Sequence, residues 1–331
     1  MVDIIQAVVG LVVLVLAADR MVRSSIRVSR SLGVSVILIG AVIVGFGTSV
    51  PEFLVSGLAA LEGNIDLAVS NVTSSNTANV SLVLGAAALL TPIASRRAVI
   101  RREGALMFAS VVTLAAVLAG GHPELWQGLL LLGSLGVATT LMARWASEDP
   151  DAVLAEIEEE LGGDETEADG EPTTEAALES RFRRLRSDVG RELVIGIVAL
   201  GITLVAADQL LDGAIGLGER FGLSAAFLGL MTGVGTSLPE LSAAIAAARH
   251  GESDLILGNI LGSNIFNSLG VAGLAATIGP GPLVDVTPII VGLMVAASFM
   301  AGLFAFTGQR IVRLEGVLLL VAFVAYGLYV F

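Results

Sequence analysis

The chain contains the same polar motif twice, each time inside a long apolar run. GTSVPE occupies residues 47–52 and GTSLPE occupies residues 235–240, an offset of 188. At the same offset, SNVTSSNTAN (70–79) aligns with GNILGSNIFN (258–267). Agreement in two separate segments indicates an internal duplication, so we expect the fold to consist of two related halves.

Apolar segments of membrane-spanning length place this duplication in a lipid bilayer. Hydrophobic residues make up 55% of the chain, and runs of about 20 such residues cross the hydrocarbon core as helices. The apolar runs, the Gly/Pro breaks and the charges predict ten spans. These are expected at 4–26, 35–60, 66–90, 103–120, 124–145, 192–216, 224–248, 254–278, 286–307 and 312–330. The predicted fold class is an all-α polytopic membrane protein.

The number of spans determines how the two halves are related. Each repeat has five spans, and an odd number means that the second copy starts from the opposite side of the membrane. We therefore predict two inverted five-helix repeats, 1–145 and 191–331, related by an axis in the membrane plane. Residues 146–190 form the linker between them. Its stretch 147–188 holds 15 acidic and 4 basic residues, a composition typical of a solvated segment.

The arginines predict the orientation. The chain has no lysine, and all 18 of its basic residues are arginines. With the N-terminus outside, every arginine except Arg220 lies in or beside a cytoplasmic loop, as the positive-inside rule requires. We expect a cell-membrane protein with both termini outside and the linker in the cytoplasm. A lysine-free chain of net charge −13 is typical of a halophilic prokaryote, although a GC-rich genome can also encode arginine in place of lysine.

The repeated motif puts polar groups at a depth where a membrane helix needs apolar ones. Pro51 has no N–H to give to the carbonyl of Gly47, so the helix is expected to kink or unwind there and to expose backbone carbonyls. Irregular backbone at this depth is tolerated only against protein or a watery cavity. An uncompensated Glu52 near the bilayer centre would cost roughly 2.5–3.5 kcal/mol. These features predict a buried polar site.

The duplication supplies two matching sets of oxygen donors to this site. The candidate ligands are Gly45, Thr48, Ser49, Glu52, Ser75 and Asn79 in the first repeat and Gly233, Thr236, Ser237, Glu240, Ser263 and Asn267 in the second. All are oxygen ligands, which suit hard cations such as Ca²⁺ and Na⁺ better than zinc or copper. The two carboxylates together carry −2, which one Ca²⁺ or two Na⁺ would balance. Ions that share these carboxylates must compete for them.

The two motifs, each followed by a segment ending in SNxxN, resemble the paired alpha repeats of the calcium/cation antiporter superfamily, in particular its prokaryotic sodium/calcium exchanger branch. The resemblance covers both membrane halves. It implies the ten-helix inverted-repeat exchanger fold and exchange of Na⁺ for Ca²⁺, with no cofactor besides the transported ions. It also implies alternating access, in which the first and sixth helices slide across a fixed core. We expect the protein to work as a monomer in the bilayer, without a nucleic-acid partner.

The resemblance also implies roles for individual residues. The main calcium ligands would be Glu52 and Glu240 with the carbonyls of Thr48 and Thr236. The sodium sites would add Ser49, Ser237, Ser75, Ser263, Asn79 and the carbonyls of Gly45 and Gly233. The sequence departs from the branch in two places. Asn267 stands where aspartate is frequent, which removes a titratable group but keeps an oxygen. Ser70 and Ser74 replace glycines, which predicts a looser helix contact in the first repeat.

An intramembrane hydrolase, an ion channel and a calcium/proton antiporter are the alternatives to sodium/calcium exchange. An intramembrane hydrolase needs a base beside its serine, but the chain has no lysine and both histidines fall in loops, so we do not expect an enzyme. An ion channel would also use oxygen-lined sites, and only coupling to a second ion distinguishes it from an antiporter. A calcium/proton antiporter is the principal alternative, because protons can compete for two buried carboxylates.

Overall fold

The computed structural model describes residues 2–147, 189–222 and 234–330. Nearly all of these residues are helical. Within the described residues, six helices are long and apolar enough to cross a membrane, and a bent pair adds a seventh candidate. Most of the predicted linker, and Gly233 with the segment before it, lie outside the described residues.

The first half of the chain contains one unbroken long helix followed by several broken ones. Its elements are α1 (Val2–Leu32), α2 (Val36–Leu38), the π-helix η1 (Ile39–Gly45), α3 (Phe46–Thr48), α4 (Val50–Leu61), α5 (Ile65–Ala78), the π-helix η2 (Asn79–Val83), α6 (Leu84–Leu90), β1 (Ile93–Ala94), α7 (Arg97–Val99), the π-helix η3 (Ile100–Gly104), α8 (Ala105–Leu118) and α9 (Leu125–Ser147).

The second half follows the same plan. Its elements are α12 (Val189–Arg220), α14 (Leu238–Arg249), α15 (Ser253–Ile265), the π-helix η4 (Phe266–Val271), α16 (Ala272–Ile278), α17 (Pro288–Gly308), β2 (Arg310–Ile311) and α18 (Arg313–Val330). The described helices fall where spans were predicted, with shifted ends, and the first part of the span predicted at 224–248 lies outside the described residues. α1 continues to Leu32 instead of ending near residue 26, because its polar last turns bury Ser25 and Ser29 against the protein.

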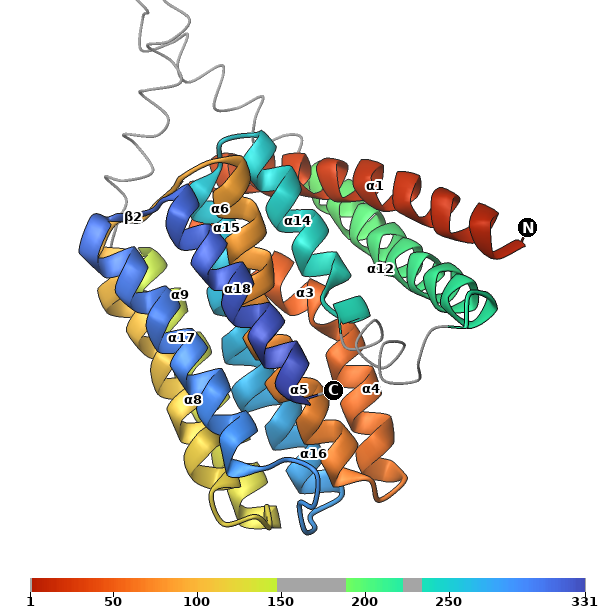
Figure 1. Ribbon diagram of the computed structural model, residues 1–331. Helices are drawn as coiled ribbons and strands as arrows, with labels where there is room; N and C mark the ends of the chain where they lie inside the picture. Colours follow the sequence, from red (N-terminus) through yellow and green to blue (C-terminus); the bar gives the residue numbers. More distant parts are fainter. Residues whose placement is uncertain (1, 148–188, 223–233, 331) are drawn as a thin grey trace, which may run out of the picture.

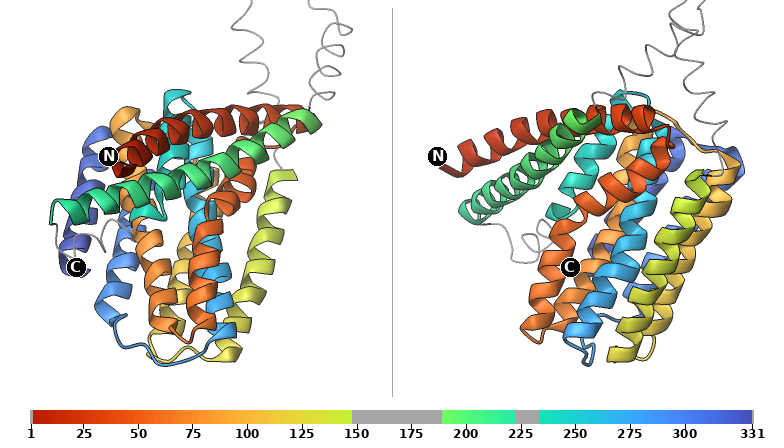
Figure 2. Two further views of the ribbon diagram at one scale, coloured as in Figure 1. Left: turned by 90° about the vertical axis from the view of Figure 1, so that its right-hand side faces the viewer. Right: turned by 180° about the vertical axis from the view of Figure 1, so that it is seen from behind.

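α1 and α12 form a long antiparallel pair that lies across one side of the bundle (Figures 1 and 2). Small residues bring the two backbones together. A Cβ atom at Gly10 would lie 2.6 Å from the Leu210 nitrogen, and one at Gly213 would lie 2.5 Å from the Ala7 nitrogen. Glycine is therefore needed at both positions for this close packing.

α15 is the central helix of the bundle. All of its residues from Leu255 to Ile265 are buried. It crosses α2 and η1 at backbone contact. A Cβ atom at Gly258 would lie 2.4 Å from the carbonyl oxygen of Ile37 in α2, and one at Gly262 would lie 2.3 Å from that of Ala41 in η1. This glycine-lined crossing positions the second-repeat serines and asparagines beside the broken span of the first repeat.

The duplication is visible in the local backbone. Ser49 and Ser237 interrupt their helices with φ/ψ of −82°/3° and −92°/8°, and each precedes a helix with proline in its first turn. The helix before Ser49 is bent by 43° relative to α4, in agreement with the kink predicted at Pro51. Residues 223–233, which precede the break at Ser237, lie outside the described residues.

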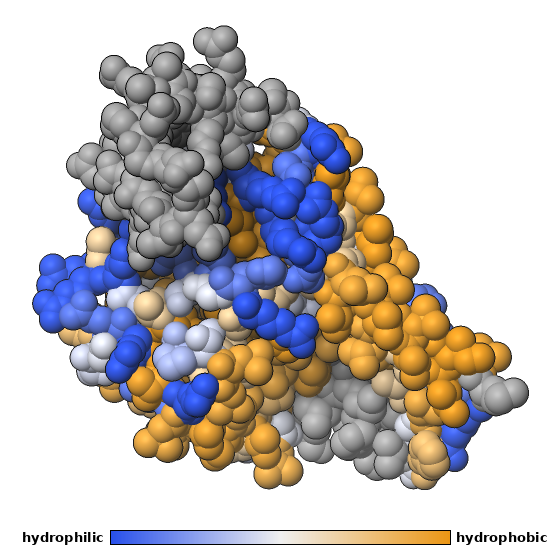
Figure 3. Space-filling model, turned by 90° about the horizontal axis from the view of Figure 1, so that it is seen from above, coloured by the Kyte–Doolittle hydropathy of each residue, from blue (hydrophilic) through white to orange (hydrophobic). Residues whose placement is uncertain are grey.

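The two ends of the bundle are closed in different ways. At the upper end in Figure 1, β1 pairs antiparallel with β2, with Ile93 opposite Ile311. At the other end, the Asp66 carboxylate accepts hydrogen bonds from the backbone nitrogens of Val284 (2.8 Å), Asp285 (3.0 Å) and Val286 (3.3 Å). Seen from above, hydrophilic residues gather on the upper face while apolar residues cover the flanks (Figure 3). This distribution is that of a multi-pass membrane protein.

Candidate ion-binding site

The two repeated glutamates come together inside the bundle. Glu52 and Glu240 are both fully buried, at 0% exposure, and their carboxylates are close enough to interact electrostatically. Ser49 Oγ of the first repeat lies 3.5 Å from Glu240 Oε1 of the second. Each glutamate lies in the first turn of the helix that follows its break, α4 or α14, where the helix dipole favours negative charge.

Several oxygens around the glutamates have no hydrogen-bond partner among the described residues. They are Glu52 Oε1 and Oε2, Glu240 Oε2, Ser237 Oγ, Asn79 Oδ1 and Asn267 Oδ1. Burying an unpaired carboxylate is costly, so such groups normally hold a counter-ion or a metal. A cluster of free oxygens around two acids therefore fits a hard cation.

Amide groups on one side of the site hold each other in a chain of hydrogen bonds. Asn79 Nδ2 donates to Asn264 Oδ1 (3.0 Å), and Asn264 Nδ2 donates to the carbonyl oxygen of Asn76 (3.3 Å). Asn76 Nδ2 donates in turn to Ser268 Oγ (2.8 Å). Both the oxygen and the nitrogen of the Asn264 amide are therefore engaged in hydrogen bonds within the protein. Asn79 is fixed through its nitrogen and keeps its oxygen for a ligand.

The backbone next to the break is also part of the hydrogen-bond network. The Gly45 carbonyl oxygen accepts from Ser263 Oγ at 3.1 Å and from the Ser49 nitrogen at 3.2 Å. Thr48 Oγ1 donates to the Val44 carbonyl at 2.9 Å and lies 3.3 Å from Asn259 Oδ1. Gly45 and Ser263 are thus engaged with each other.

The structure brings together most of the predicted ligands. Ten of them are buried: Gly45, Thr48, Ser49, Glu52, Ser75, Asn79, Ser237, Glu240, Ser263 and Asn267. Thr236 is half-buried, with its hydroxyl 3.4 Å from Ser75 Oγ. Gly233 lies outside the described residues. Sequence reasoning missed Asn259 and Ser268, although Asn259 lies in the duplicated segment opposite Asn71.

The architecture and the two-acid site can be compared with known proteins. The family model described as "Sodium/calcium exchanger protein" matches residues 2–143 and 192–331. The chain belongs to this family. Exchanger family membership confirms the resemblance drawn from the GTSVPE and GTSLPE motifs, and it places the protein among membrane antiporters of cations.

Individual exchanger relatives match over nearly their whole length. The chain is 37% identical to "Putative antiporter CaxA" of Alkalimonas amylolytica, over 97% of this chain and 96% of the relative. It is 28% identical to "Sodium/calcium exchanger MaX1" of Methanosarcina acetivorans, over 98% and 97%. Its structure is similar to that of the sodium-calcium exchanger NCX_Mj, with a TM-score of 0.78 at 24% identity, covering 98% and 97%. The predicted exchanger fold is confirmed.

In this exchanger, α12 covers the helix breaks of both repeats. A Cβ atom at Gly47 would lie 2.4 Å from Leu200 Cδ2, and one at Gly235 would lie 2.4 Å from Leu211 Cδ2. Both motif glycines therefore make room for a leucine of α12. The two leucines are eleven residues apart, or about 16 Å along the helix axis.

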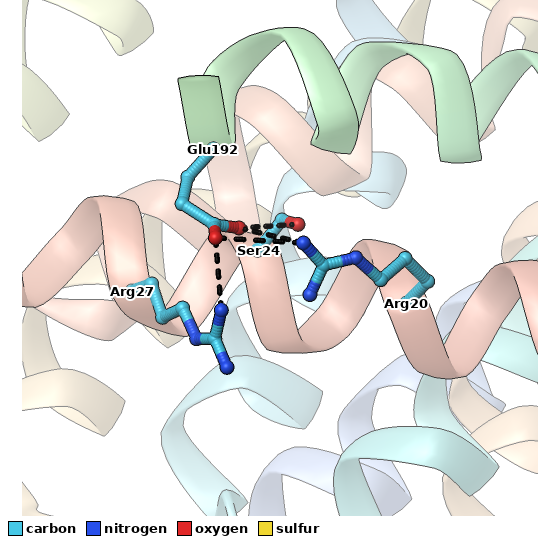
Figure 4. A network of polar contacts seen from close by, with 4 residues as sticks. All are labelled: Arg20, Ser24, Arg27 and Glu192. Atoms are coloured by element: carbon cyan, nitrogen blue, oxygen red, sulfur yellow. Dashed lines mark hydrogen bonds and ion pairs between the residues drawn. The ribbon is translucent and has the colours of Figure 1, made fainter. Parts of the chain in front are cut away.

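Ion pairs fasten α12 to α1 near both ends of the exchanger's long helix pair. Glu192 of α12 accepts from Arg27 (2.8 Å), Ser24 (3.0 Å) and Arg20 (3.2 Å) of α1 (Figure 4). At the other end, Arg220 lies 2.6 Å from Asp3. These contacts join α1 and α12 into one unit.

Two further pairs join α1 to the turn between α14 and α15. His250 Nε2 lies 2.7 Å from Asp19 Oδ1, and Arg30 Nη2 lies 3.2 Å from Glu252 Oε1. They connect the long helix pair to the rest of the bundle on the side to which the linker attaches (Figure 1). Residues of these pairs are more than 200 positions apart in the chain.

Proposed function

We propose that this exchanger family member moves Na⁺ and Ca²⁺ in opposite directions across the cell membrane, with both ions using the site between Glu52 and Glu240. The observation that carries the proposal is the pair of fully buried carboxylates with three oxygens that have no partner among the described residues. One Ca²⁺ or two Na⁺ neutralise this pair. Because the two loads need the same carboxylates, one must leave before the other binds.

The free oxygens sharpen the set of proposed ligands. Glu52 and Glu240 bind Ca²⁺ together with the Thr48 and Thr236 carbonyls. Five hydroxyl and amide ligands complete the sodium sites: Ser49, Ser237, Ser75, Asn79 and Asn267. Ser263 and the Gly45 carbonyl, which are hydrogen-bonded to each other, contribute to a sodium site only if their bond opens. Gly233 keeps the role that the family resemblance gives it.

The neutral Asn267 limits the charge that the site can balance. In the described part of the chain, no group of three or more His, Asp or Glu side chains is arranged to hold a metal ion. The site therefore carries at most the two charges of Glu52 and Glu240. A load of one Ca²⁺ or two Na⁺ leaves no net charge buried in the membrane, which is the cheapest state electrostatically.

The α1–α12 pair provides a means of alternating access. We propose that it slides as one unit across the remaining helices, so that Leu200 and Leu211 cover the two breaks in turn. The close contacts at Gly10 and Gly213 keep the pair together. We place the acidic linker in the cytoplasm and both termini outside, in keeping with the arginines at the end where the linker attaches.

A flux assay in liposomes tests the function directly. Purified protein in sodium-loaded liposomes should take up ⁴⁵Ca²⁺ when diluted into sodium-free potassium buffer, and uptake should stop when external Na⁺ equals internal Na⁺. Uptake that is independent of the sodium gradient would indicate a channel and contradict the proposal.

Calcium/proton exchange is the second candidate, favoured by the unpaired oxygens of Glu52 and Glu240, which protons could also neutralise. It predicts calcium uptake driven by an acidic liposome interior in sodium-free buffer. The same liposomes, with the sodium and pH gradients imposed separately, distinguish the two antiporters.

A further inference from the structure

A groove outside the ion site opens between α8 and α17. Its volume is about 310 Å³, and its lining is almost entirely apolar. Leu257, Ile260 and Leu261 of the central helix α15 form its floor. The groove extends from Ile311 on β2 to Ser298, near the middle of α17.

The groove is open towards the flank of the bundle that lipid covers. Phe299, Leu303 and Phe306 of α17 line it and remain 58%, 45% and 50% exposed. Gly302 also lines it, and a Cβ atom there would meet no other atom within 4 Å. The absence of a side chain at residue 302 therefore keeps space free that a leucine would occupy.

Unpaired positive charges lie at the β1–β2 end of the groove. Arg97, Arg101, Arg310 and Arg313 are exposed, and none forms an ion pair or hydrogen bond within the described part of the chain. Arg101 directly follows Ile100, and Arg310 directly precedes Ile311, both of which line the groove. Guanidinium groups beside an apolar channel are complementary to a phosphate that carries an acyl chain.

We propose that this groove binds one anionic phospholipid of the cytoplasmic leaflet. One acyl chain lies on Leu257, Ile260 and Leu261, and the phosphate contacts Arg101 and Arg310. The bound chain supports α15 on the face that carries Asn264, whose amide nitrogen lies 4.0 Å from the sulfur of Met107 in the groove lining.

The inverted repeat offers an internal comparison for this site. The positions related by the offset of 188 to Arg97, Arg101, Arg310 and Arg313 are Asp285, Ile289, His122 and Leu125. The duplicated counterpart thus lacks the basic residues. The positive-inside rule alone explains arginines on the cytoplasmic side, but it does not require them to adjoin an apolar groove.

Lipid binding to the purified full-length protein tests the proposal without any transport measurement. Native mass spectrometry and thermal unfolding in detergent are recorded with added phosphatidylglycerol, with phosphatidylcholine, and with glycerol phosphate as the headgroup without chains. We expect one tightly retained phosphatidylglycerol and a rise in melting temperature that phosphatidylcholine and glycerol phosphate do not produce.

Two variants and two matched controls locate the site. R101Q/R310Q should weaken phosphatidylglycerol binding about tenfold, and G302L, which fills the groove, should abolish the retained lipid. R191Q/R249Q removes two unpaired arginines from the same side of the protein, and G292L adds a leucine at an open glycine in the outer half of α17. Both controls should bind like the unmodified protein.

The proposal is overturned if phosphatidylcholine is retained as well as phosphatidylglycerol, which would mean ordinary lipid contact only. It is equally overturned if the control variants lose binding to the same extent, since the groove would then not be the site. Neither result would bear on sodium/calcium exchange, which the liposome assay measures separately.

Discussion

The two repeats supply the same acid at the same place but surround it differently. Glu240 has one oxygen within 3.5 Å of the Ser49 hydroxyl. Neither oxygen of Glu52 accepts a hydrogen bond within 3.5 Å among the described residues, although the Ser75 hydroxyl lies near its carboxylate, and Ser237, the counterpart of Ser49, is likewise unpaired. Near-identical motifs therefore produce unequal sites, and the inverted symmetry is broken where the ions are expected. A bound cation can therefore contact two unpaired oxygens at Glu52 but only one at Glu240.

The helices next to the motifs differ as well. In the second repeat, Gly258 and Gly262 let α15 touch the backbone of η1. Their counterparts in the first repeat are Ser70 and Ser74, and the Ser74 hydroxyl lies 3.2 Å from that of Tyr326 on α18. The residues that correspond to η1 in the second repeat, 227–233, lie outside the described ranges, so the looser contact in the first repeat stays a prediction.

The largest expected effect is the loss of either acid. Glu52→Gln and Glu240→Gln should each weaken Ca²⁺ binding by roughly 30-fold or more, because removing one buried charged partner costs about 2–5 kcal/mol. The loss should be greater for Glu52→Gln, since no hydrogen bond within 3.5 Å satisfies either Glu52 oxygen among the described residues. Calorimetric Ca²⁺ titration and ⁴⁵Ca²⁺ flux measure both variants.

Glu62→Gln is the matched control for these variants, because Glu62 is exposed at the end of the same span. It should bind and transport Ca²⁺ normally. If Glu52→Gln and Glu240→Gln weaken Ca²⁺ binding equally, the two halves of the site are equivalent when ions are bound. Undiminished flux in either inner variant would contradict the assignment of the site.

A second large effect is expected at the glycine crossing. Gly262→Ala puts a methyl group 2.3 Å from the Ala41 carbonyl oxygen and 2.5 Å from its Cα, so one backbone must move. Overpacking of this kind costs about 1–3 kcal/mol. Thermal unfolding in detergent should show a clear drop in melting temperature.

Gly57→Ala is the control for that substitution, because its Cβ atom would meet only Leu274 Cδ2 at 3.8 Å.

Ser74→Gly tests the corresponding helix position in the first repeat. It removes the contact with Tyr326 and should change stability less than Gly262→Ala does. A smaller effect at Gly262 than at Gly57 would mean that the crossing is not close in solution.

The features that could be predicted from the sequence are those that follow from the spacing of apolar residues and from the internal duplication. The apolar runs predicted the spans, Pro51 predicted the bend after Thr48, and the offset predicted that Glu52 and Glu240 meet. These features leave a pattern along the chain, because each span must satisfy the bilayer by itself and the second repeat must match the first.

Features that depend on side chains from distant spans were not predictable in this way. Glu192 binds Arg20 and Arg27, residues that precede it by 172 and 165 positions, and such a pair leaves no local signal. The free oxygen of Asn79 and the engaged amide of Asn264 follow from hydrogen bonds between spans. The motif gives both residues the same chemistry, so only their neighbours distinguish them.

An effect of intermediate size is expected where the bundle ends are closed. Asp66→Ala removes the acceptor of backbone N–H groups at Val284, Asp285 and Val286. Hydrogen bonds to a charged group contribute about 1.5–3 kcal/mol, so the variant should unfold at lower temperature. Limited proteolysis should cut the loop 279–287 faster.

Its counterpart Asp254→Ala provides the comparison. Asp254 pairs with Arg96, whose side chain is 42% exposed, and exposed ion pairs contribute only about 0–1 kcal/mol. The drop in melting temperature should therefore be smaller than for Asp66→Ala. The reverse order would mean that the aspartate cap on loop 284–286 does not stabilise that end.

The smallest effect, and the most direct test of the asymmetry, concerns the two motif serines. Ser49→Ala removes the hydrogen bond to Glu240, which at 3.5 Å is long and should contribute about 0.5 kcal/mol at the lower end of the usual range. Ser237→Ala removes a hydroxyl without a partner among the described residues, so it should leave the ion-free protein as stable as before. Melting temperatures measured without ions report the hydrogen bonds within the protein, and those measured at saturating Na⁺ also report the contribution of each hydroxyl to ion binding. Both variants should lose part of the stabilisation by Na⁺, while only Ser49→Ala should lower the ion-free melting temperature. If Ser237→Ala lowers it equally, Ser237 binds Glu52 when no ion is present, and the two halves of the site are equivalent after all.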